Sequence, residues 1–520
     1  MKKISESIRF LTRSSIVTLS VTFGAFFGSL AEAETTKPNV IFIYADDMGI
    51  GDVSHNGGLA ATPHIDRMAA EGMRFTDAHS ASAVCTPSRY ALLTGRYSWR
   101  TRLASVVFNN PDYAPLIEPE EPTVARLFNE NGYDTAMVGK WHLGIKWQYI
   151  KDYEYGPGKK PHQGWDIDFS KPAIDTPTSH GFDSFWGIAA SLDMPPYLYI
   201  ENKTALTTEQ IIKKRGREGP MDVNFQANQC LKDFARESVA YIDTHAKTDK
   251  PFFLYVPLTS PHSPVVPSED WQGKSSLGRY GDFLMETDWV VGQVLDALDR
   301  NGLTENTLVI FSADNGASPS AGIPALKKKG HLVNGNLRGH KADIYEGGHR
   351  VPFVVRWPAV VESNSVTSRL TCQTDFIRTC AEILGVSLAD NSGVDSVSFL
   401  STLKDSSQVE RSAVVHHSVN GSFAIRQGDW KLVLCSGSGG WTYPMPGKEP
   451  EGSPEVQLFN LAVDLGETNN LQAQHPERVE ALTALLRNYV DNGRSTDGSQ
   501  QKNAWDVDIG PNPRVPRTIY

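Results

Sequence analysis

The chain has 520 residues, of which 40% are apolar and 21% are charged, and its formal net charge is −10. This composition is typical of a large globular protein with a substantial core and leaves room for two or three domains. The acidic balance argues against nucleic acid as a partner, since nucleic-acid-binding domains concentrate positive charge. A net acidic protein that binds anions must gather its cations locally.

The first 33 residues have the layout of a secretory signal peptide. Basic side chains precede an apolar stretch from Ile16 to Leu30, and Ala31-Glu32-Ala33 has the small-x-small pattern of a cleavage site. We therefore expect residues 1–33 to be removed before Glu34 and the protein to be exported, either to the periplasm or as a secreted protein. An uncleaved membrane anchor is the alternative, but the stretch is short for a spanning helix, and no stable membrane span is expected.

The first strand pattern ends in two carboxylates. Residues 39–44 are a continuous run of apolar, β-branched and aromatic side chains, which predicts a buried parallel strand, and Asp46 and Asp47 follow it. Open α/β sheets bind their ligands at the carboxyl ends of strands. Because adjacent carboxylates repel each other unless a cation lies between them, the pair indicates a metal site, with a solvated turn as the alternative.

A cysteine follows at the predicted start of a helix. In Cys85-Thr86-Pro87-Ser88-Arg89, Pro87 predicts the first helical position, and the helix is expected to end at Gly95. Cys85 then lies at or just before a helix N-terminus, where free N–H groups and the helix dipole favour bound oxyanions. The alternative is a structural thiol beside the helix.

Basic side chains follow further strand patterns. Residues 134–138 and 251–256 are strand-like runs that lead into such side chains, and a glycine-rich segment near residue 340 contains another. A loop lysine or histidine is usually solvated or structural, but a shared position after strands favours convergence at one end of a sheet. These residues are Lys140, His142, His262 and Lys341.

A second strand pattern also ends in oxygen donors. Residues 307–312 precede Asp314 and Asn315, although an Asn-Gly turn would also explain the latter. Two strands that both end in oxygen donors indicate one shared site. Its all-oxygen ligands suit Ca²⁺ or, less well, Mg²⁺, and no His/Cys cluster has zinc spacing.

Helix patterns alternate with these strands. Thr62-Pro63 begins one that ends at Gly72, Thr123 begins another that ends at Gly132, and a long amphipathic helix is expected over about 280–300. This alternation predicts an α/β fold in which helices cover both faces of a mostly parallel sheet.

A smaller C-terminal α+β subdomain is predicted after the polar stretch from Asp390 to Gln408, so that the main domain spans 34–405 and the subdomain 406–520. Two strand patterns flank Gln427-Gly428-Asp429, which indicates a hairpin in an antiparallel sheet, and residues 476–490 predict a terminal helix.

The chain has five cysteines. An exported protein can form disulfides, but a helix predicted over 374–384 would strain a Cys372–Cys380 bridge. We expect mostly free, buried thiols. Apart from Cys85, they are Cys230, Cys372, Cys380 and Cys435.

Together these motifs resemble the type I, formylglycine-dependent sulfatases of the alkaline-phosphatase superfamily. In that family the cysteine of Cys-x-Pro-Ser/Ala-Arg is oxidised to Cα-formylglycine (3-oxoalanine). The resemblance runs from Asn39 to about Leu400 in matching order and continues more weakly beyond, and the motifs are closest to the arylsulfatase A and N-acetylgalactosamine-6-sulfatase branch. It implies an alkaline-phosphatase-like sheet, a bound Ca²⁺, and modification of Cys85 by a formylglycine-generating enzyme.

The resemblance also implies a role for each site residue. Lys140, His262 and Lys341 would bind the substrate's sulfate, with His262 and Lys341 next to the leaving oxygen. Arg89, Lys140 and His142 would surround the formylglycine. The metal ligands would be Asp46, Asp47, Asp314, Asn315 and an oxygen of modified Cys85. No role is implied for His340, His349, His416 and His417, which are expected to be structural or exposed.

The implied chemistry is a displacement at sulfur. One hydroxyl of the hydrated aldehyde, a gem-diol, would ligate Ca²⁺ and attack sulfur to give a covalent sulfo-enzyme. The metal and the cations would offset charge in the transition state. His262 would protonate the leaving alkoxide, and His142 would take the proton of the remaining hydroxyl to expel sulfate. A thiol or a serine has no second hydroxyl for that last step.

Two segments rich in aromatic residues could bind the rest of the substrate. Residues 146–185 contain Trp147 and Trp165, and residues 437–452 contain Trp441. Aromatic faces beside cations suit a sulfated sugar, although ordinary loop packing is the alternative. We therefore expect an exported sulfatase that acts on a carbohydrate or aryl sulfate. A formylglycine-dependent phosphonate or phosphate ester hydrolase, and a non-catalytic sulfated-glycan-binding protein, are the competing hypotheses.

Overall fold

The computed structural model describes residues 37–111, 113–150, 164–207, 209–213, 216–408 and 411–511. The predicted signal peptide and its cleavage site lie outside these residues, as does part of the aromatic segment 146–185. None of the described helices combines the length and the apolar character that crossing a membrane requires.

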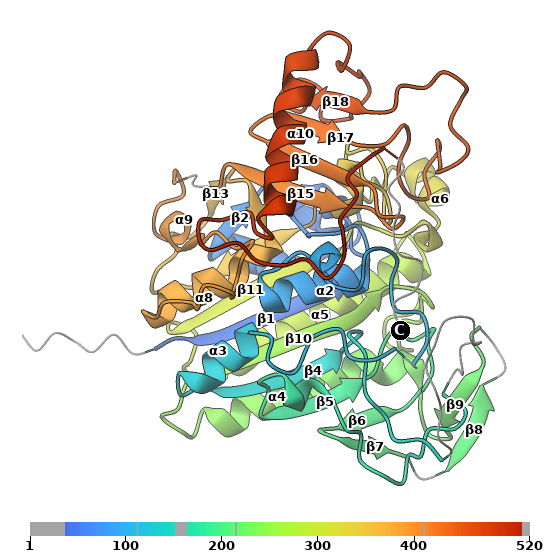
Figure 1. Cartoon of the computed structure of the whole chain (residues 1–520). Coiled ribbons are helices and arrows are strands. Elements are labelled where there is room, and N and C mark those ends of the chain that lie inside the picture. Colours follow the sequence, from blue (N-terminus) through green and yellow to red (C-terminus); the bar gives the residue numbers. More distant parts are fainter. Residues whose placement is uncertain are drawn as a thin grey trace, which may run out of the picture. The chain divides into compact units, whose positions relative to one another are not determined.

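A ten-stranded sheet lies between layers of helices (Figure 1). In spatial order its strands are β13 (Ser365–Thr367), β2 (Met73–Phe75), β12 (Phe353–Arg356), β11 (Thr307–Ala313), β1 (Asn39–Asp46), β10 (Phe252–Pro261), β4 (Asp134–Lys140), β5 (Ser184–Ile188), β6 (Tyr199–Glu201) and β7 (Thr204–Leu206). The central block from β11 to β5 is parallel throughout. Antiparallel pairs follow on both sides, at β11–β12 and at β5–β6.

Strand β1 shows why helices cover both faces of the sheet. All of its residues are buried, and alternate side chains point to opposite faces, so that Phe42 packs in one core and Ile43 in another. The first core includes residues of α2 (Cys85–Thr94), α3 (Val124–Glu130) and α8 (Phe376–Leu384). The second includes residues of α1 (Pro63–Ala70), α4 (Cys230–His245) and α5 (Arg279–Arg300). The predicted α/β architecture is confirmed.

The start of α2 differs slightly from the prediction. Cys85 is the first residue of the helix and Pro87 the third, whereas the sequence placed Pro87 first. The N–H groups of the whole first turn lack partners inside the helix, so proline is tolerated there as well as at the first position. The helix ends at Gly95, which has a φ of 65° and closes the turn as predicted.

The C-terminal part contains a separate antiparallel sheet, drawn in orange and red in Figure 1. Its strands are β15 (Ala413–His417), β16 (Phe423–Gln427), β17 (Trp430–Val433) and β18 (Gln457–Asn460). Helix α10 (Pro476–Asp491) buries Leu482 and Leu486 in the same core as β15 and β16. The predicted hairpin and terminal helix are therefore present, while the boundary near residue 405 remains a prediction.

The described chain also contains short strands and helices. They include the strand pairs β3 (Ala78–His79) with β14 (Thr371–Cys372) and β8 (Gln210–Lys213) with β9 (Gly219–Asp222), and the helices α6 (Ile323–Lys328), α7 (Glu346–His349) and α9 (Leu400–Lys404). After α10 the chain returns to the segment between α2 and α3, where Trp505 Nε1 donates to the carbonyl of Trp99 at 2.8 Å. All five cysteines are buried and free, as expected.

Candidate active site

The carboxyl ends of four neighbouring parallel strands supply most of the predicted site residues. Asp46 ends β1 and Lys140 ends β4, while His262 and Asp314 directly follow β10 and β11. Because these strands run in parallel, their ends lie at one edge of the sheet. The structure thus brings together residues that are far apart in the sequence.

Cys85 lies at the centre of this group. Its Sγ is 3.6 Å from Asp46 Oδ1 and 3.5 Å from Lys341 Nζ, and the residue is only 2% exposed. Burial raises the pKa of the Cys85 thiol well above its ordinary value, despite the nearby lysines. A thiol needs its thiolate form to act as a nucleophile. The unmodified side chain is therefore a poor nucleophile.

Carboxylate and amide oxygens that could ligate a metal lie close together near Cys85. Asn315 Nδ2 donates to Asp47 Oδ1 at 2.8 Å, and the backbone N–H of Asp47 donates to Asp314 Oδ1 at 3.1 Å. Asn315 Oδ1 is buried, and the described residues provide no hydrogen-bond partner for it. Asp46, Asp47, Cys85 and His262 form a group whose potential ligand atoms all lie within 4.8 Å of one another. A buried amide oxygen without a hydrogen-bond partner, next to carboxylates that lie this close together, is a ligand set that suits a hard cation.

Each carboxylate also has a buried cation as a partner. Lys140 Nζ is 2.6 Å from Asp46 Oδ2, Lys341 Nζ is 2.6 Å from Asp47 Oδ1, and Arg89 Nη2 is 2.7 Å from Asp314 Oδ2. With all three carboxylates ionised, as a bound cation would favour, three negative and three positive charges balance within the protein. A divalent cation added here would leave an excess of +2, which favours an anionic substrate.

The ionisation of the carboxylates follows from this crowding. Burial opposes the ionisation of Asp46, but Lys140 and other cations hold the pKa of that carboxyl well below its usual range. For Asp314, burial and then the charge of Asp46 raise the pKa to about 7 despite Arg89. Burial disfavours the charged form of Lys341, yet Asp47 and other anions raise its pKa and keep the ammonium protonated. The site therefore holds fixed positive charge beside Cys85.

Both predicted histidines are neutral at neutral pH. Burial, followed by the charge of Lys140, lowers the pKa of His142 well below its usual value, and burial also lowers the pKa of His262. His142 Nε2 lies 2.9 Å from the carbonyl oxygen of Phe108, and its buried Nδ1 has no partner among the described residues. His262 Nδ1 bonds to the carbonyl of Ser263, and its Nε2 lies 3.7 Å from Asp47 Oδ2.

Two site residues have left-handed backbone geometry. Asp47 has a φ of 63° and His142 a φ of 61°. Such conformations cost free energy in residues other than glycine and cluster at functional sites, where surrounding structure holds them. Here they occur where the chain leaves β1 and β4, and both side chains belong to the group around Cys85.

Cys85 opens into a cavity of about 350 Å³. Its lining includes His142, His262 and Lys341 together with residues that the sequence analysis did not single out. The latter include Asp193, Arg217, Met194 and Ser318. They carry no local motif, because each is an ordinary loop residue that reaches the cavity only through the fold.

The aromatic predictions have mixed outcomes. Trp441 lines the cavity, as expected for the segment 437–452. Trp147 does not, because it is 3% exposed and packs edge-on against Phe169 at 5.5 Å between ring centres. Trp165 is 42% exposed and is not part of the cavity lining. For Trp147, ordinary loop packing was the correct alternative.

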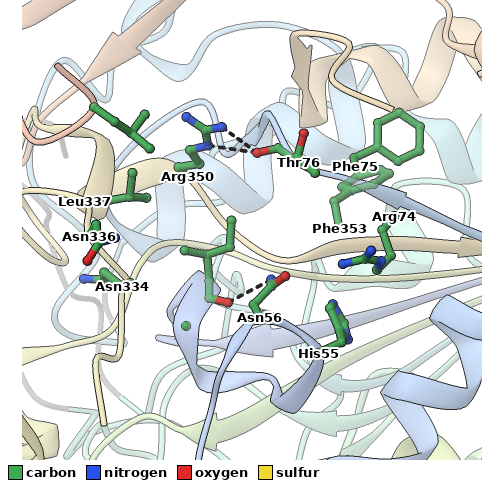
Figure 2. A pocket seen from close by; sticks show the side chains of 14 residues that line it. His55, Asn56, Arg74, Phe75, Thr76, Asn334, Asn336, Leu337, Arg350 and Phe353 are labelled. Carbon is green, nitrogen blue, oxygen red and sulfur yellow. Dashed lines mark hydrogen bonds between the residues drawn. The ribbon is translucent and has the colours of Figure 1, made fainter. Parts of the chain in front are cut away.

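A second cavity of about 310 Å³ is shown in Figure 2. Arg350 donates to the carbonyl of Thr76 at 2.6 Å on one wall, and Asn56 donates to the carbonyl of Ile50 at 3.0 Å on another. The predicted site residues, all of them described, do not line it. Cys85, His142, His262 and Lys341 line the cavity described above instead.

A buried histidine cluster brings together residues of β3, of α7 and of β15 in the C-terminal sheet. His79, Glu346, His349 and His416 have potential metal-binding atoms within 4.8 Å of one another. However, the rings of His349 and His416 stack at 3.7 Å with an interplanar angle of 10°, so one ion cannot lie in the planes of both. Lys431 Nζ also lies 3.0 Å from Glu346 Oε1, where it supplies the positive charge. This arrangement fits a structural role.

Replacing His416 with phenylalanine is expected to make the protein less sensitive to acid. Burial, followed by the neighbouring His349, holds the pKa of His416 well below its usual value. The folded protein keeps this ring neutral, whereas the unfolded chain takes up a proton below about pH 6.5. Stability is therefore lost as the pH falls below that value.

Phenylalanine keeps a flat ring but cannot titrate. The variant should recover about 1.4 kcal/mol of the unfolding free energy that is lost between about pH 7.5 and 5.5. Urea unfolding at both pH values measures this difference. His475→Phe is the control, because the His475 side chain is 36% exposed. Equal acid sensitivity in wild type and His416→Phe would contradict the expectation.

Comparison with known proteins identifies relatives of the chain. The family model described as Sulfatase matches residues 38–386. An N-acetylgalactosamine-6-O-sulfatase of Bacteroides thetaiotaomicron is 34% identical over 495 residues, which cover 86% of this chain and 92% of that protein. The N-acetylgalactosamine-6-sulfatase of Mus musculus is 29% identical, with 88% of this chain and 86% of that protein covered.

A solved structure from Bacteroides thetaiotaomicron, described in connection with the metabolism of multiple glycosaminoglycans, has a TM-score of 0.76 and 30% identity. The match covers 87% of this chain and 99% of the chain in the solved structure. The sulfatase PsFucS1 from Pseudoalteromonas has a TM-score of 0.67 and 24% identity, which shows a shared fold. The matches and the fold together show that the chain belongs to the sulfatase family.

Proposed function

We propose that this sulfatase removes sulfate from carbohydrate sulfates, and from small aryl sulfates, by means of a formylglycine formed from Cys85 and a bound Ca²⁺. The observation that carries the proposal is the convergence of oxygen donors and three buried cations around residue 85. The relatives named for N-acetylgalactosamine 6-sulfate favour a 6-sulfated amino sugar as the substrate.

The residues around Cys85 fit both a bound Ca²⁺ and a formylglycine at position 85. Asp46, Asp47, Asp314 and Asn315 would hold the ion, and the partnerless Oδ1 of Asn315 supports this assignment. When bound, the ion would withdraw charge from the sulfate oxygens, and a hydrated formylglycine would supply a geminal diol as the nucleophile. Mg²⁺ is the less favoured ion, because it keeps waters and demands stricter geometry.

The chain's own residues would bind sulfate and move protons. Lys140, Lys341 and Arg89 hold fixed positive charge around the position that the sulfate would take. His262 uses Nδ1 to bond the carbonyl of Ser263, which leaves Nε2 as the atom that would carry a proton to the leaving oxygen. The charge of a bound sulfate favours protonation there, and the protonated Lys341 can assist.

His142 is placed to accept a proton. Its Nε2 bonds to the carbonyl of Phe108, so the hydrogen of the neutral ring belongs on Nε2 and the lone pair on Nδ1. That Nδ1 is buried, and the described residues leave it without a partner. The low pKa of His142 keeps this nitrogen unprotonated at neutral pH. We assign it as the base that would release sulfate.

Two measurements test the proposal. Protein produced together with a formylglycine-generating enzyme should hydrolyse 4-nitrophenyl sulfate with a much higher kcat/KM than an aryl phosphate diester. Mass spectrometry of the peptide that spans residues 81–89 should show a loss of about 18 Da, the change from thiol to aldehyde. A preference for the phosphate diester would favour the phosphonate or phosphate hydrolase instead. Active protein with an intact Cys85 would exclude the formylglycine mechanism, and modified protein that binds sulfated sugar without turnover would support the binding hypothesis.

A further inference from the structure

We infer that Asp193, Arg217 and Trp441 form a sugar-binding wall that faces Cys85 and selects carbohydrate sulfates by their ring and hydroxyl groups. This inference rests on the proposed function and adds the residues that recognise the rest of the substrate. All three line the cavity that contains Cys85, His262 and Lys341. Asp193 lies in the loop after β5, Arg217 precedes β9, and Trp441 belongs to the loop between β17 and β18.

Trp441 lines the cavity as a half-exposed residue whose backbone is held in place. The residue is 48% exposed, and its backbone N–H donates to Asp343 Oδ1 at 2.8 Å. The same carboxylate oxygen accepts the backbone N–H of Thr442 at 2.9 Å. We call these two hydrogen bonds to Asp343 the clamp. Because Asp343 is two residues from Lys341, the clamp fixes the Trp441 loop to the segment that would bind sulfate.

A close backbone approach completes the clamp. A Cβ on Gly440 would lie 2.4 Å from the carbonyl oxygen of Ala342, so only glycine fits there. The loop is therefore built against residues 341–343. An exposed indole that is held rigidly by its backbone is well suited to stack on the apolar face of a sugar ring.

Asp193 and Arg217 provide the complementary polar groups. Arg217 Nη2 lies 3.7 Å from Asp193 Oδ2, and the two side chains are 39% and 33% exposed. Arg217 Nη1 donates to the carbonyl of Asn109 at 3.2 Å, and Tyr197 donates to the carbonyl of Arg217 at 2.8 Å, which hold the arginine in place. Both residues line the cavity with partly exposed side chains, so a ligand in the cavity can reach them.

The charge of this pair indicates what it binds. A lone arginine would favour a second anion, but here the carboxylate of Asp193 lies 3.7 Å away and offsets part of its charge. A guanidinium beside a carboxylate offers hydrogen-bond donors next to acceptors, and a sugar hydroxyl needs both. We therefore assign hydroxyl groups of a neutral sugar ring, rather than another sulfate or carboxylate, as the ligand of the pair.

The test of the pair compares two substrates. Arg217→Ala and Asp193→Ala should each lower the ratio of kcat/KM for N-acetylgalactosamine 6-sulfate to that for 4-nitrophenyl sulfate by roughly tenfold or more, because the aryl ester has no hydroxyl for the pair to bind. Arg236→Ala is the matched control, since the Arg236 side chain is 60% exposed in α4 and outside the cavity. An unchanged ratio in both variants would overturn the inference.

The test of Trp441 uses rescue by another aromatic residue. Trp441→Ala should raise KM for the sugar sulfate roughly tenfold, and Trp441→Phe should restore most of the loss. Tyr443→Ala is the control in the same loop, because Tyr443 is 64% exposed and does not line the cavity. Equal KM values in wild type and Trp441→Ala would show that the indole does not contribute to sugar binding.

Binding without turnover separates this inference from the proposed function. Titration calorimetry of N-acetylgalactosamine 6-sulfate with Cys85→Ala protein, with and without Arg217→Ala, measures Kd directly. A roughly tenfold weaker Kd in the double variant supports the wall, even if the wild type proves to have no sulfatase activity. An unchanged Kd overturns the wall, even if sulfatase activity is found.

Discussion

Replacing Cys85 with alanine is expected to lower kcat/KM for 4-nitrophenyl sulfate by at least about 1,000-fold, because the variant lacks the side chain from which the proposed nucleophile is made. The buried thiol, whose pKa is well above its ordinary value, is itself a poor nucleophile. Alanine leaves the surrounding charges of Asp46 and Lys341 paired with Lys140 and Asp47, so the loss should come from chemistry and not from unfolding.

The control is another buried cysteine. Cys230 in α4 is 0% exposed and does not line the cavity, so Cys230→Ala removes a comparable thiol without touching the site. Both proteins should be compared by steady-state kinetics and by thermal unfolding. Retention of a tenth or more of the activity by folded Cys85→Ala would show that residue 85 is not the nucleophile.

Removal of divalent metal is expected to reduce activity by about 1,000-fold or more, and added Ca²⁺ should restore it. The ion is needed because the ionised carboxylates offset the three cations of the site, so that little excess positive charge would remain to bind an anionic ester. The protein is treated with a chelator, dialysed and assayed with Ca²⁺ or Mg²⁺. Better reactivation by Mg²⁺ would overturn the choice of Ca²⁺. Full activity without metal would show that the reaction does not need a metal ion.

Stability provides a second readout of the same site. Ca²⁺ at about 100 times its Kd should stabilise the metal-free protein by about 2.7 kcal/mol, because it binds the folded chain alone. Asn315→Ala removes the amide oxygen that lacks a partner and should weaken this effect, while the ion pairs of the three aspartates remain. An identical response to Ca²⁺ in wild type and Asn315→Ala would contradict the assignment of Asn315 as a ligand.

Local patterns were sufficient for the elements that carry the chemistry. The apolar run before Asp46 predicted β1, the run before Asp314 predicted β11, and the CTPSR segment placed Cys85 at the start of α2. These features depend on neighbouring residues, because a strand buried on both faces must be apolar throughout and helix ends need particular residues. Local helix geometry also argued against a Cys372–Cys380 bridge, and both cysteines are free.

Some local predictions fell short for lack of long-range information. The strand predicted over 251–256 extends to Pro261, because β10 pairs with β1 as far as Asp46. The aromatic segment 146–185 looked like a substrate loop, but Trp147 packs in the core instead. Composition cannot distinguish a tryptophan that stacks on a ligand from one that fills a core, since both are large apolar side chains in a loop.

The sequence by itself therefore determined which residue types are available for the chemistry and at which strand and helix ends they lie. Only the tertiary structure decided that β1 lies between β10 and β11, that Asp343 clamps the loop of Trp441, and that Asp193 and Arg217 line the same cavity. The reason is physical: strand order and loop packing arise from contacts between residues hundreds of positions apart, and no local pattern encodes such contacts.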